Sequence, residues 1–500
     1  MTRLGRIAAV TGVGILGIWG VLSASPAAAK TPRPAPASVA SLSSFGYGSC
    51  ALLTSGRVDC WGAGFFGQLG NGTFYRTGHT ANARPVQVEG VGGTGTLSGV
   101  SSLTGDWTDS TCALLDSSGV DCWGFGDEGQ LGNGTFNVSA IPVPVEGVGG
   151  TGTLTGVARL VTDRDGTYCA LLDSGGVDCW GSGGYGALGN GTFSSSATPV
   201  QVDGVGGTGT LTGVAALASE GGSSYCALLD SGAVDCWGWG VDGELGNGTF
   251  YTATNNRGSA TPVQVEGVGG TGTLNGVAAL ASDGSGFCAI LGSGGVDCWG
   301  FGIGGELGNG TFYPRTGNDG SATPVQVEGV GGTGTLTGVR SLLSGDTAYC
   351  AILGSGGVDC WGDNFSGGLG NGTFSNSATP VQVEGVGGTG TLTGVRSLAS
   401  VLQGVCAVLA SGEVDCWGLG HDGELGNGRF PNGRDNYGSD TPVQVARGRL
   451  TGVASVTGEE LDYCAVLDSG GVKCWGWGKD GELGNGHWAH SARPVKVALH

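Results

Sequence analysis

Short apolar segments recur along the chain, each bounded by glycine, asparagine or serine. In one stretch they are GVAALAS (213–219), CALLD (226–230), VDCWG (234–238) and PVQV (262–265). Runs of this length with turn residues on both sides are typical of β-strands. After residue 29, no segment keeps apolar residues at the 3.6-residue spacing of an amphipathic helix. The pattern therefore predicts an all-β chain of many short strands.

These four segments form one unit that occurs eight times. Each unit has a variant of CALLTSGRVDCWG, then GxLGNG, a loop, and Pro-Val-x-Val; six of the seven junctions carry GVGGTGTL, and the seventh has ARGRLTGV (446–453). Four short strands per unit, repeated eight times, predict a single β-propeller of four-stranded blades. A β-solenoid is the alternative, although its repeats are usually shorter. The first cysteines of the units lie 56 to 62 residues apart, at Cys50, Cys112, Cys169, Cys226, Cys288, Cys350, Cys406 and Cys464.

Units with ALxxxGxVxxWG, then GxLG, then PxxV resemble the repeats of the regulator of chromosome condensation family. The resemblance covers roughly residues 40 to 500. It implies a β-propeller, usually of seven blades in that family, whereas eight complete units here favour eight. The family includes secreted bacterial members similar to the β-lactamase inhibitory protein of the second type, which implies binding or inhibition of an extracellular protein. Nucleotide exchange on a small GTPase, as in nuclear members, fits this chain less well.

The sixteen cysteines form eight pairs with the spacing C-x9-C. A hairpin loop of Asp173, Ser174 and Gly175 would place Cys169 opposite Cys179. Glycine occupies the last loop position in seven units, as such loops require; in the second unit Ser118 stands there and Gly119 follows, which allows a shifted loop. Metal binding is the alternative, but there is no C-x-x-C and the histidines do not recur with the repeat. We expect disulfides Cys50–Cys60, Cys112–Cys122, Cys169–Cys179, Cys226–Cys236, Cys288–Cys298, Cys350–Cys360, Cys406–Cys416 and Cys464–Cys474.

The first 29 residues have the pattern of an export signal. Arg3 and Arg6 precede an apolar stretch at 7–22, and Ala27-Ala28-Ala29 matches a cleavage site. An uncleaved membrane anchor is the alternative. Residues 30–38 form a proline-rich linker, and 39–500 form the predicted propeller. An even number of cysteines agrees with an oxidising compartment, so we expect a secreted, extracellular protein with no membrane association after cleavage.

Composition and charge narrow the classes of partner. The chain has 110 glycines, 12% charged residues and a net charge of −20. Nucleic acids and anionic membranes are disfavoured as partners, because phosphate binding needs a basic face. We expect a monomer that binds a protein or a cell-surface component.

Several motifs resemble catalytic or ligand-binding sites but lack residues that such sites need. LDSGGV, which contains 173–177 and recurs at 468–472, resembles a serine-protease string but has no recurring histidine base. GVGGTG occurs six times with no helix after it, unlike a dinucleotide loop. The acidic strings VDGE, HDGE and KDGE supply two carboxylates each, too few for calcium. The sequence predicts no catalytic residue, cofactor or metal, and therefore no enzyme.

A tryptophan follows the second cysteine of every unit, from Trp61 to Trp475. Carbohydrate binding is one interpretation of such a series. Because a large aromatic residue stands at the same place in each unit, packing between blades is the better interpretation.

Loops of unequal length follow GxLGNG. Units one, four, five and seven have 12 or 13 residues before the proline of PVxV, and the other four have seven, as in 192–198 and 373–379. The long loops contain tyrosine and arginine, which are favoured at interfaces; tolerated surface insertion is the alternative. We expect partner-binding residues at Tyr75, Arg76, Tyr251, Arg257, Tyr313, Arg315, Arg434 and Tyr437.

The ends of the chain suggest a way to close the ring. If blades begin at PVxV, the first blade lacks that strand and Pro494–Val497 is left over. Pairing of the last segment with the first blade would then remove two exposed edges.

Overall fold

The computed structural model describes residues 38–499, except 77–79, 283, 316–317, 346–347, 432–437 and 459. These residues belong to one compact unit. The predicted export signal and most of the proline-rich linker lie outside the described residues. In the described ranges, no helix is long and apolar enough to cross a membrane.

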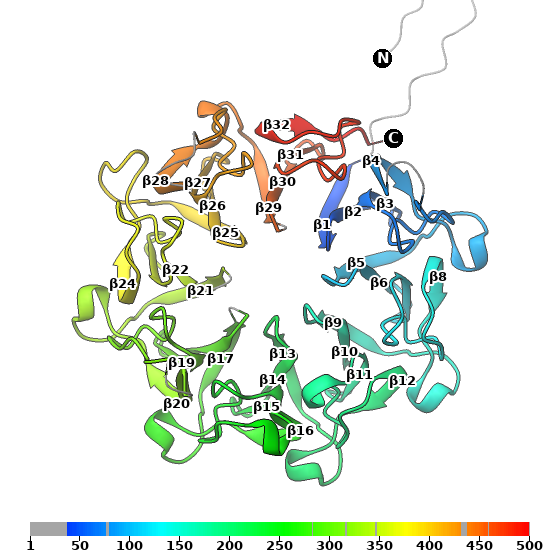
Figure 1. The fold of residues 1–500 in the computed structure, drawn as a ribbon, viewed down its shortest axis with the longest axis horizontal. Coiled ribbons are helices and arrows are strands. Elements are labelled where there is room, and N and C mark those ends of the chain that lie inside the picture. Colours follow the sequence, from blue (N-terminus) through cyan, green and yellow to red (C-terminus); the bar gives the residue numbers. More distant parts are fainter. Residues whose placement is uncertain are drawn as a thin grey trace, which may run out of the picture. The chain divides into compact units, whose positions relative to one another are not determined.

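Eight four-stranded antiparallel sheets form a ring, one for each repeat (Figure 1). In every sheet the strands lie in chain order. The propeller and its eight blades are confirmed, and we number the blades 1 to 8 along the chain. The innermost strands are β1 (Val39–Phe45), β5 (Val100–Gly105), β9 (Val157–Thr162), β13 (Val214–Ser219), β17 (Val277–Ser282), β21 (Val339–Ser344), β25 (Val395–Val401) and β29 (Val453–Gly458).

The second and third strands of each blade contain the two cysteines. The second strands are β2 (Gly48–Leu53), β6 (Ser110–Leu115), β10 (Thr167–Leu172), β14 (Ser224–Leu229), β18 (Gly286–Leu291), β22 (Ala348–Leu353), β26 (Gly404–Leu409) and β30 (Asp462–Leu467). The third strands are β3 (Val58–Ala63), β7 (Val120–Gly124), β11 (Val177–Gly181), β15 (Val234–Trp239), β19 (Val296–Phe301), β23 (Val358–Gly362), β27 (Val414–Leu419) and β31 (Val472–Gly476).

The outermost strands begin before the proline of PVxV, earlier than the sequence pattern indicates. In β12 the strand starts at Ser196, because Ser196 pairs with Gly181 across a bulge while Val200 pairs with Cys179. The outermost strands are β4 (Ala81–Gln87), β8 (Ser139–Pro144), β12 (Ser196–Gln201), β16 (Gly258–Gln264), β20 (Gly320–Gln326), β24 (Ser377–Gln382), β28 (Gly438–Gln444) and β32 (Ser491–Lys496).

Helical structure in the described residues is limited to three-residue 3-10 turns. Most of them lie in the junctions between blades, where glycine adopts a left-handed conformation that other residues disfavour, such as Gly92 at φ 73°. The turns are η1 (Val91–Gly93), η2 (Val148–Gly150), η3 (Gly184–Gly186), η4 (Val205–Gly207), η5 (Ala253–Asn255), η6 (Val268–Gly270), η7 (Val330–Gly332) and η8 (Val445–Arg447).

The hairpin register predicted from the cysteines is confirmed. Cys169 lies directly opposite Cys179, and Leu171 opposite Val177. The expected shift in the second unit is wrong. Ser118 adopts the left-handed conformation itself, at φ 61°, and its N–H donates to the Leu115 carbonyl as Gly175 does to Leu172. The loop keeps its length because the strand pairing on either side is the same as in the other blades.

All eight predicted disulfides are present, with paired Cα atoms 4.0 to 4.1 Å apart. The described residues include no free cysteine. Each bond closes a short loop, which stabilises the fold by about 2–3 kcal/mol in the entropy model.

Tryptophan and GxLG together join neighbouring blades. Trp237 of blade 4 is buried against Cys169, Leu188 and other residues of blade 3. Its indole N–H donates to the Ala187 carbonyl in the GALG turn of blade 3, at 2.9 Å. The same bond, 2.6 to 2.9 Å long, occurs at all eight interfaces. The structural interpretation of the tryptophans is therefore confirmed, since none of the eight is exposed.

The predicted exchange of a strand at ring closure is wrong. Blades end with PVxV, so β4 completes blade 1 and β32 pairs with β31 in blade 8. The ring closes by side-to-side packing, as at every other interface. Trp61 of blade 1 donates to the Glu482 carbonyl of blade 8, and Val39 N–H donates to the Gly470 carbonyl. A shared apolar cluster contains Leu53 and Trp61 from blade 1 and Leu483 and Val497 from blade 8.

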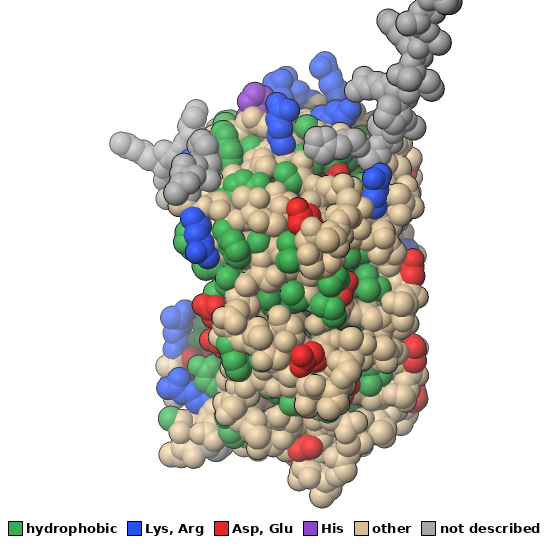
Figure 2. Space-filling model, turned by 90° about the vertical axis from the view of Figure 1, so that its right-hand side faces the viewer, with side chains coloured by type: hydrophobic (Ala, Val, Ile, Leu, Met, Phe, Trp, Pro, Cys, Tyr) green, Lys and Arg blue, Asp and Glu red, His purple; other side chains and the backbone are tan. Residues whose placement is uncertain are grey.

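Charged side chains are unevenly distributed around the ring. In Figure 2, Lys and Arg side chains gather at the top of the molecule, the part that contains β31, β32 and β4 in Figure 1. Asp and Glu side chains are the more frequent charged groups on the rest of the rim that this view shows.

Candidate functional site

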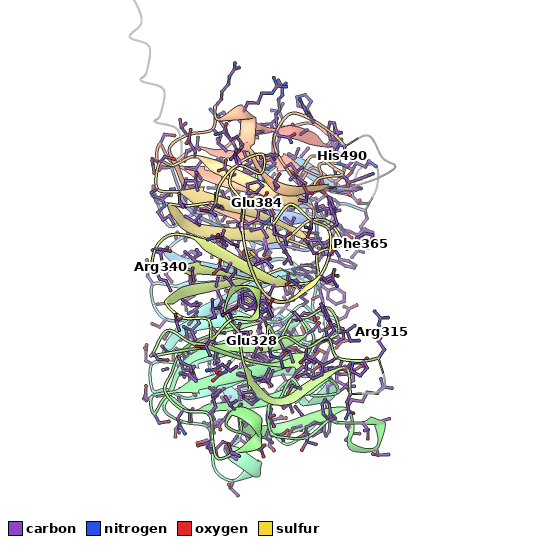
Figure 3. All side chains as sticks on the ribbon, turned by 90° about the vertical axis from the view of Figure 1, so that its left-hand side faces the viewer. Arg315, Glu328, Arg340, Phe365, Glu384 and His490 are labelled. Atoms are coloured by element: carbon purple, nitrogen blue, oxygen red, sulfur yellow. A yellow bond between two sulfur atoms is a disulfide. The ribbon has the colours of Figure 1, made fainter. Side chains whose placement is uncertain are left out.

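Strand order places two kinds of loop on one face of the ring. Because each blade is a four-stranded antiparallel meander, the turn between its first two strands and the loop between its last two emerge on the same side. We call this side the loop face; the cysteine hairpins and the junctions between blades lie toward the other side, the hairpin face. Figure 3 shows this arrangement: Arg315 and Phe365, from loops after third strands, point to one side, and Arg340, at the start of β21, lies on the other.

A pocket of about 410 Å³ occupies the centre of the ring at the loop face. Seven blades contribute the last residue of the first strand or a residue of the turn that follows, and blade 1 contributes Ser44, the next-to-last residue of β1. Hydroxyl groups tie neighbouring blades together here: Ser219 donates to the Thr162 carbonyl at 2.6 Å, and Ser400 donates to the Ser344 carbonyl at 2.7 Å. The wall of the pocket is therefore polar and built from equivalent positions.

Two buried carboxyl groups line this pocket. Asp163 accepts hydrogen bonds from the N–H groups of Asp165 and Thr167, and Glu220 accepts one from the Ser224 hydroxyl. Their second oxygens, Asp163 Oδ2 and Glu220 Oε2, have no hydrogen-bond partner among the described residues. Burial raises the pKa of Asp163 to about 7 and that of Glu220 to about 8. Each can therefore gain or lose a proton near neutral pH.

A tryptophan and an arginine lie beside these carboxyl groups. The Arg164 guanidinium is 3.8 Å from the centroid of the Trp107 ring, a cation–π distance. Both residues come from turns after first strands, in blades 3 and 2, and both line the pocket. The pocket thus combines an apolar ring, a cation and ionisable acids, a mixture suited to a polar side chain or small ligand.

The predicted tyrosines of the long loops have a common structural role. The hydroxyl groups of Tyr75, Tyr251 and Tyr313 accept hydrogen bonds from the asparagine of the preceding NGT, at 2.9 to 3.1 Å. Their rings are half-buried and pack against the interfaces between blades. These tyrosines hold the loops in place and expose only part of their surface.

The predicted arginines are the more accessible part of the long loops. Arg76, Arg257 and Arg315 are exposed, and Arg76 lies over the rings of Phe65 and Phe74. Arg257 has a left-handed backbone, at φ 60°, and its carbonyl closes the loop by accepting from Gly240 N–H. Arg434 and Tyr437 lie outside the described residues.

Aromatic side chains outside the predicted set also line the loop face. Phe365 is 67% exposed, the highest fraction among the large apolar residues that the structure describes. Phe66 packs edge-on against Phe125 of the next blade, and Tyr185 against Trp239 in the same way. These residues occupy the positions after WG, where the repeat varies most. That variability is the signal that sequence reasoning could have used.

The acidic GELG motifs close their own turns. Glu306, Glu424 and Glu482 are buried, and each accepts a hydrogen bond from the N–H two residues earlier. Burial raises the pKa of each of these glutamates to about 7. Gln68 and Gln130 make the same bond in blades 1 and 2. No group of three or more metal-ligating side chains occurs in the part of the chain that the structure describes.

Comparison with known proteins places the repeat in a family. The model of the regulator of chromosome condensation (RCC1) repeat matches residues 120–158 and 174–229. The chain carries RCC1 repeats. The resemblance inferred from the WG and GxLG motifs is therefore confirmed.

Two relatives show how this RCC1-repeat chain compares with known proteins. It is 27% identical to the human E3 ubiquitin-protein ligase HERC2 over 394 residues, which are 79% of this chain and 7% of HERC2. It is 26% identical to the Arabidopsis thaliana ultraviolet-B receptor UVR8 over 375 residues, which are 75% of this chain and 76% of UVR8. The chain spans a small fraction of HERC2, which is many times longer.

Solved structures similar to this one show the same fold. Saccharomyces cerevisiae Prp20p, described with its binding to Gsp1p and histones, superposes with a TM-score of 0.55 and 19% identity over 80% of this chain and 89% of Prp20p. Yeast RCC1 (Prp20) with Kap60 bound gives 0.53 and 16% identity over 96% of this chain and 91% of that one. Likeness at this level of identity concerns the RCC1-type propeller alone.

Proposed function

We propose that this chain is a secreted protein-interaction module that binds its partner with the loop face. One observation carries the proposal. The same face has the central pocket, the exposed arginines of the long loops and the exposed aromatic residues after WG. Aromatic and arginine side chains are the residues that most often dominate binding at protein interfaces.

Variation between blades supports the choice of face. The hairpin face repeats nearly one sequence, since six junctions carry GVGGTGTL. On the loop face, by contrast, loop length and the residue after WG change from blade to blade. A surface that differs between its repeats can recognise one partner in one orientation. Similar folds in yeast are described with protein partners, namely Gsp1p, histones and Kap60.

Secretion is the second part of the proposal. Eight disulfides in the described residues agree with an oxidising compartment. The export pattern in residues 1–29 agrees with it as well. An extracellular enzyme is the partner class that the resemblance to secreted family members favours, and this chain would act as its inhibitor or binder.

The test is capture of a partner by matched variants of the mature chain. Immobilised wild type is compared with R257E/R315E on the loop face and with R57E/R159E, whose arginines lie toward the hairpin face. Both variants change the charge equally at exposed arginines. We expect a protein from culture supernatant to bind wild type and R57E/R159E, and to be lost at least tenfold with R257E/R315E. Equal capture by R257E/R315E, or loss with R57E/R159E alone, would contradict the proposed face.

Two other functions are less well supported. An adhesive or structural surface protein would bind through many equivalent blades. Its binding would then fall gradually as single blades are altered. The ligase activity in the name of HERC2 belongs to a protein of which this chain spans 7%, and it is not proposed here.

A further inference from the structure

Basic residues are concentrated near the end of the last repeats. Eight of the 21 lysines and arginines lie between residues 429 and 496, in a chain of 500 residues with a net charge of −20. Six of these eight come from the outer parts of blades 7 and 8. We call them the rim patch: Arg429, Arg447, Arg449, Lys473, Arg493 and Lys496.

Contacts between blades 7 and 8 bring these residues together. Arg447 belongs to η8, the turn that packs against β32, and β32 contains Arg493 and Lys496. Arg429 and Arg447 line one groove of about 260 Å³, together with Asn427 and Gln444. Lys473 lies directly opposite Lys496 in the pairing of β31 with β32.

The rim-patch residues of blade 8 stand at positions where most other blades have an acidic or uncharged residue. Every other blade has an aspartate where Lys473 stands, and six of those aspartates pair with a glutamine where Lys496 stands, as Asp178 does with Gln201. Arg493 replaces the threonine found in five other blades, such as Thr198. The junction before blade 8 is ARGR in place of EGVGGTGT, which exchanges an acidic residue for two arginines.

Most of the rim patch is exposed to solvent. Arg429, Arg447, Arg449, Arg493 and Lys496 are exposed, and Lys473 is half-buried. Among the described residues, no carboxylate forms an ion pair with any of the six; the ion pairs found involve His421, His490 and Asp422. Like charges directly opposite each other on neighbouring strands destabilise a sheet. We therefore expect a bound anion to reduce the repulsion between Lys473 and Lys496.

We infer that the rim patch is a binding site for a flexible polymer, other than a nucleic acid, that carries a phosphate on each unit. Four of its six residues are arginines, whose forked donors match phosphate oxygens in pairs. Several cations along one rim and one groove suit an extended chain with an anion on each unit better than one compact ion. Except for Arg429, which begins the long loop of blade 7, these residues lie outside the loops of the loop face, and binding there does not depend on the proposed protein partner.

The test uses inorganic polyphosphate as the probe and the mature chain as the protein. A repeat-restored variant, K473D/K496Q/R493T, places in blade 8 the residues that other blades have, so its fold is expected to persist. We expect wild type to bind polyphosphate in a salt-dependent manner and the variant to bind at least tenfold more weakly. The slope of log Kd against log salt should fall by about 2, because each phosphate contact on a single-stranded polymer adds about 0.7.

A charge-matched pair of variants separates the rim patch from general electrostatics. R447Q/R449Q and R257Q/R315Q each remove two exposed arginines, the first pair from the patch and the second from the loop face. Only the first should weaken polyphosphate binding, and it should leave capture of the protein partner unchanged. Circular dichroism of each variant verifies folding.

Three results would overturn the inference. One is equal affinity of wild type and the repeat-restored variant for polyphosphate, or no measurable binding by wild type. Another is binding of polyglutamate as tight as that of polyphosphate, which would remove the preference for phosphate. The third is a DNA duplex bound more tightly than polyphosphate, which would assign the patch to nucleic acid.

Discussion

The tryptophan that follows the second cysteine of each repeat links sequence periodicity to the assembly of the ring. Its recurrence indicates packing between blades, and its burial confirms that interpretation. The carbonyl that accepts its indole N–H is 49 to 55 residues earlier at seven interfaces and 421 residues later at the seam. No local pattern specifies such a partner, because it is set by the arrangement of neighbouring blades. The GxLG motif supplies the acceptor, which explains why WG and GxLG recur together.

Trp237→Phe is expected to destabilise the fold more than Trp239→Phe. The first removes the donor to the Ala187 carbonyl and leaves that buried acceptor unpaired, which costs about 1–3 kcal/mol in addition to lost packing. Trp239, two residues later in β15, is half-buried and packs edge-on against Tyr185. Chemical unfolding of both variants measures the difference. Equal losses of stability would contradict the structural role assigned to the indole.

Stability is expected to increase as pH falls from 8 to 5. Burial raises the pKa of Glu306, Glu424 and Glu482 to about 7, above the value near 4.5 of an unfolded chain. The folded state therefore holds protons more tightly than the unfolded state, and this contribution to stability is lost as pH rises through 7. The melting temperature at pH 5 should exceed that at pH 8.

Replacing the three glutamates tests the cause of that pH dependence. E306Q/E424Q/E482Q should fold, because Gln68 and Gln130 make the same turn bond in blades 1 and 2. Its melting temperature should change less between pH 5 and pH 8 than that of wild type, and should be higher than wild type at pH 8. An unchanged pH profile would assign the effect to other buried acids, such as Asp163 and Glu220.

At the scale of elements, the cysteine hairpin was the most predictable part of the blade. Two cysteines ten residues apart with a glycine at a fixed loop position determine register, turn and disulfide together. The outermost strand was less predictable, because its first residues pair across a bulge and carry no apolar alternation. The loop face was predicted in part. Loop length located the long loops, but whether Tyr251 points inward depends on Asn247 and on packing that sequence spacing does not contain.

Ser118→Gly is expected to stabilise the protein by about 0.5–1 kcal/mol. Ser118 adopts φ 61°, a conformation that is unfavourable for residues with a Cβ atom, and the other seven hairpins have glycine there. Thermal unfolding measures the gain. Gly175→Ala is the matched control in blade 3: it should destabilise, since a Cβ at φ 77° would lie 3.2 Å from the Gly213 nitrogen. A neutral result for both would mean that the loop relaxes freely.

At the scale of the whole molecule, the seam between blades 8 and 1 is equivalent to the other interfaces. It has the same indole bond and a similar apolar cluster, without any exchange of strands. The sequence alone does not locate the blade boundary, since each blade has four strands whether it begins or ends with PVxV. The position of the blade boundary is set by pairing of PVxV with the preceding VDCWG strand, which only the register of β3 with β4 reveals.

A circular permutant tests that equivalence. Its new ends lie between Gly269 and Gly270, and a copy of residues 89–99 joins Val497 to Val39, as such junctions join the other blades. Because no strand crosses between blades, its melting temperature should stay within a few degrees of wild type. The same permutant with Trp61→Phe should lose as much stability as wild type does with Trp237→Phe. Failure of the permutant to fold would indicate that the native ends contribute to closure.

Hydrogen exchange of the mature chain, with and without its captured partner, is the most direct test of whether a protein partner binds the loop face. Binding there should slow exchange in the turns that line the central pocket, such as 162–166 and 219–223, and in the long loops at 64–76 and 240–257. Exchange in the cysteine hairpins, such as 173–176, should be unchanged. Protection confined to the hairpins and the GVGGTGTL junctions, with none at the pocket, would show that the partner binds the hairpin face instead.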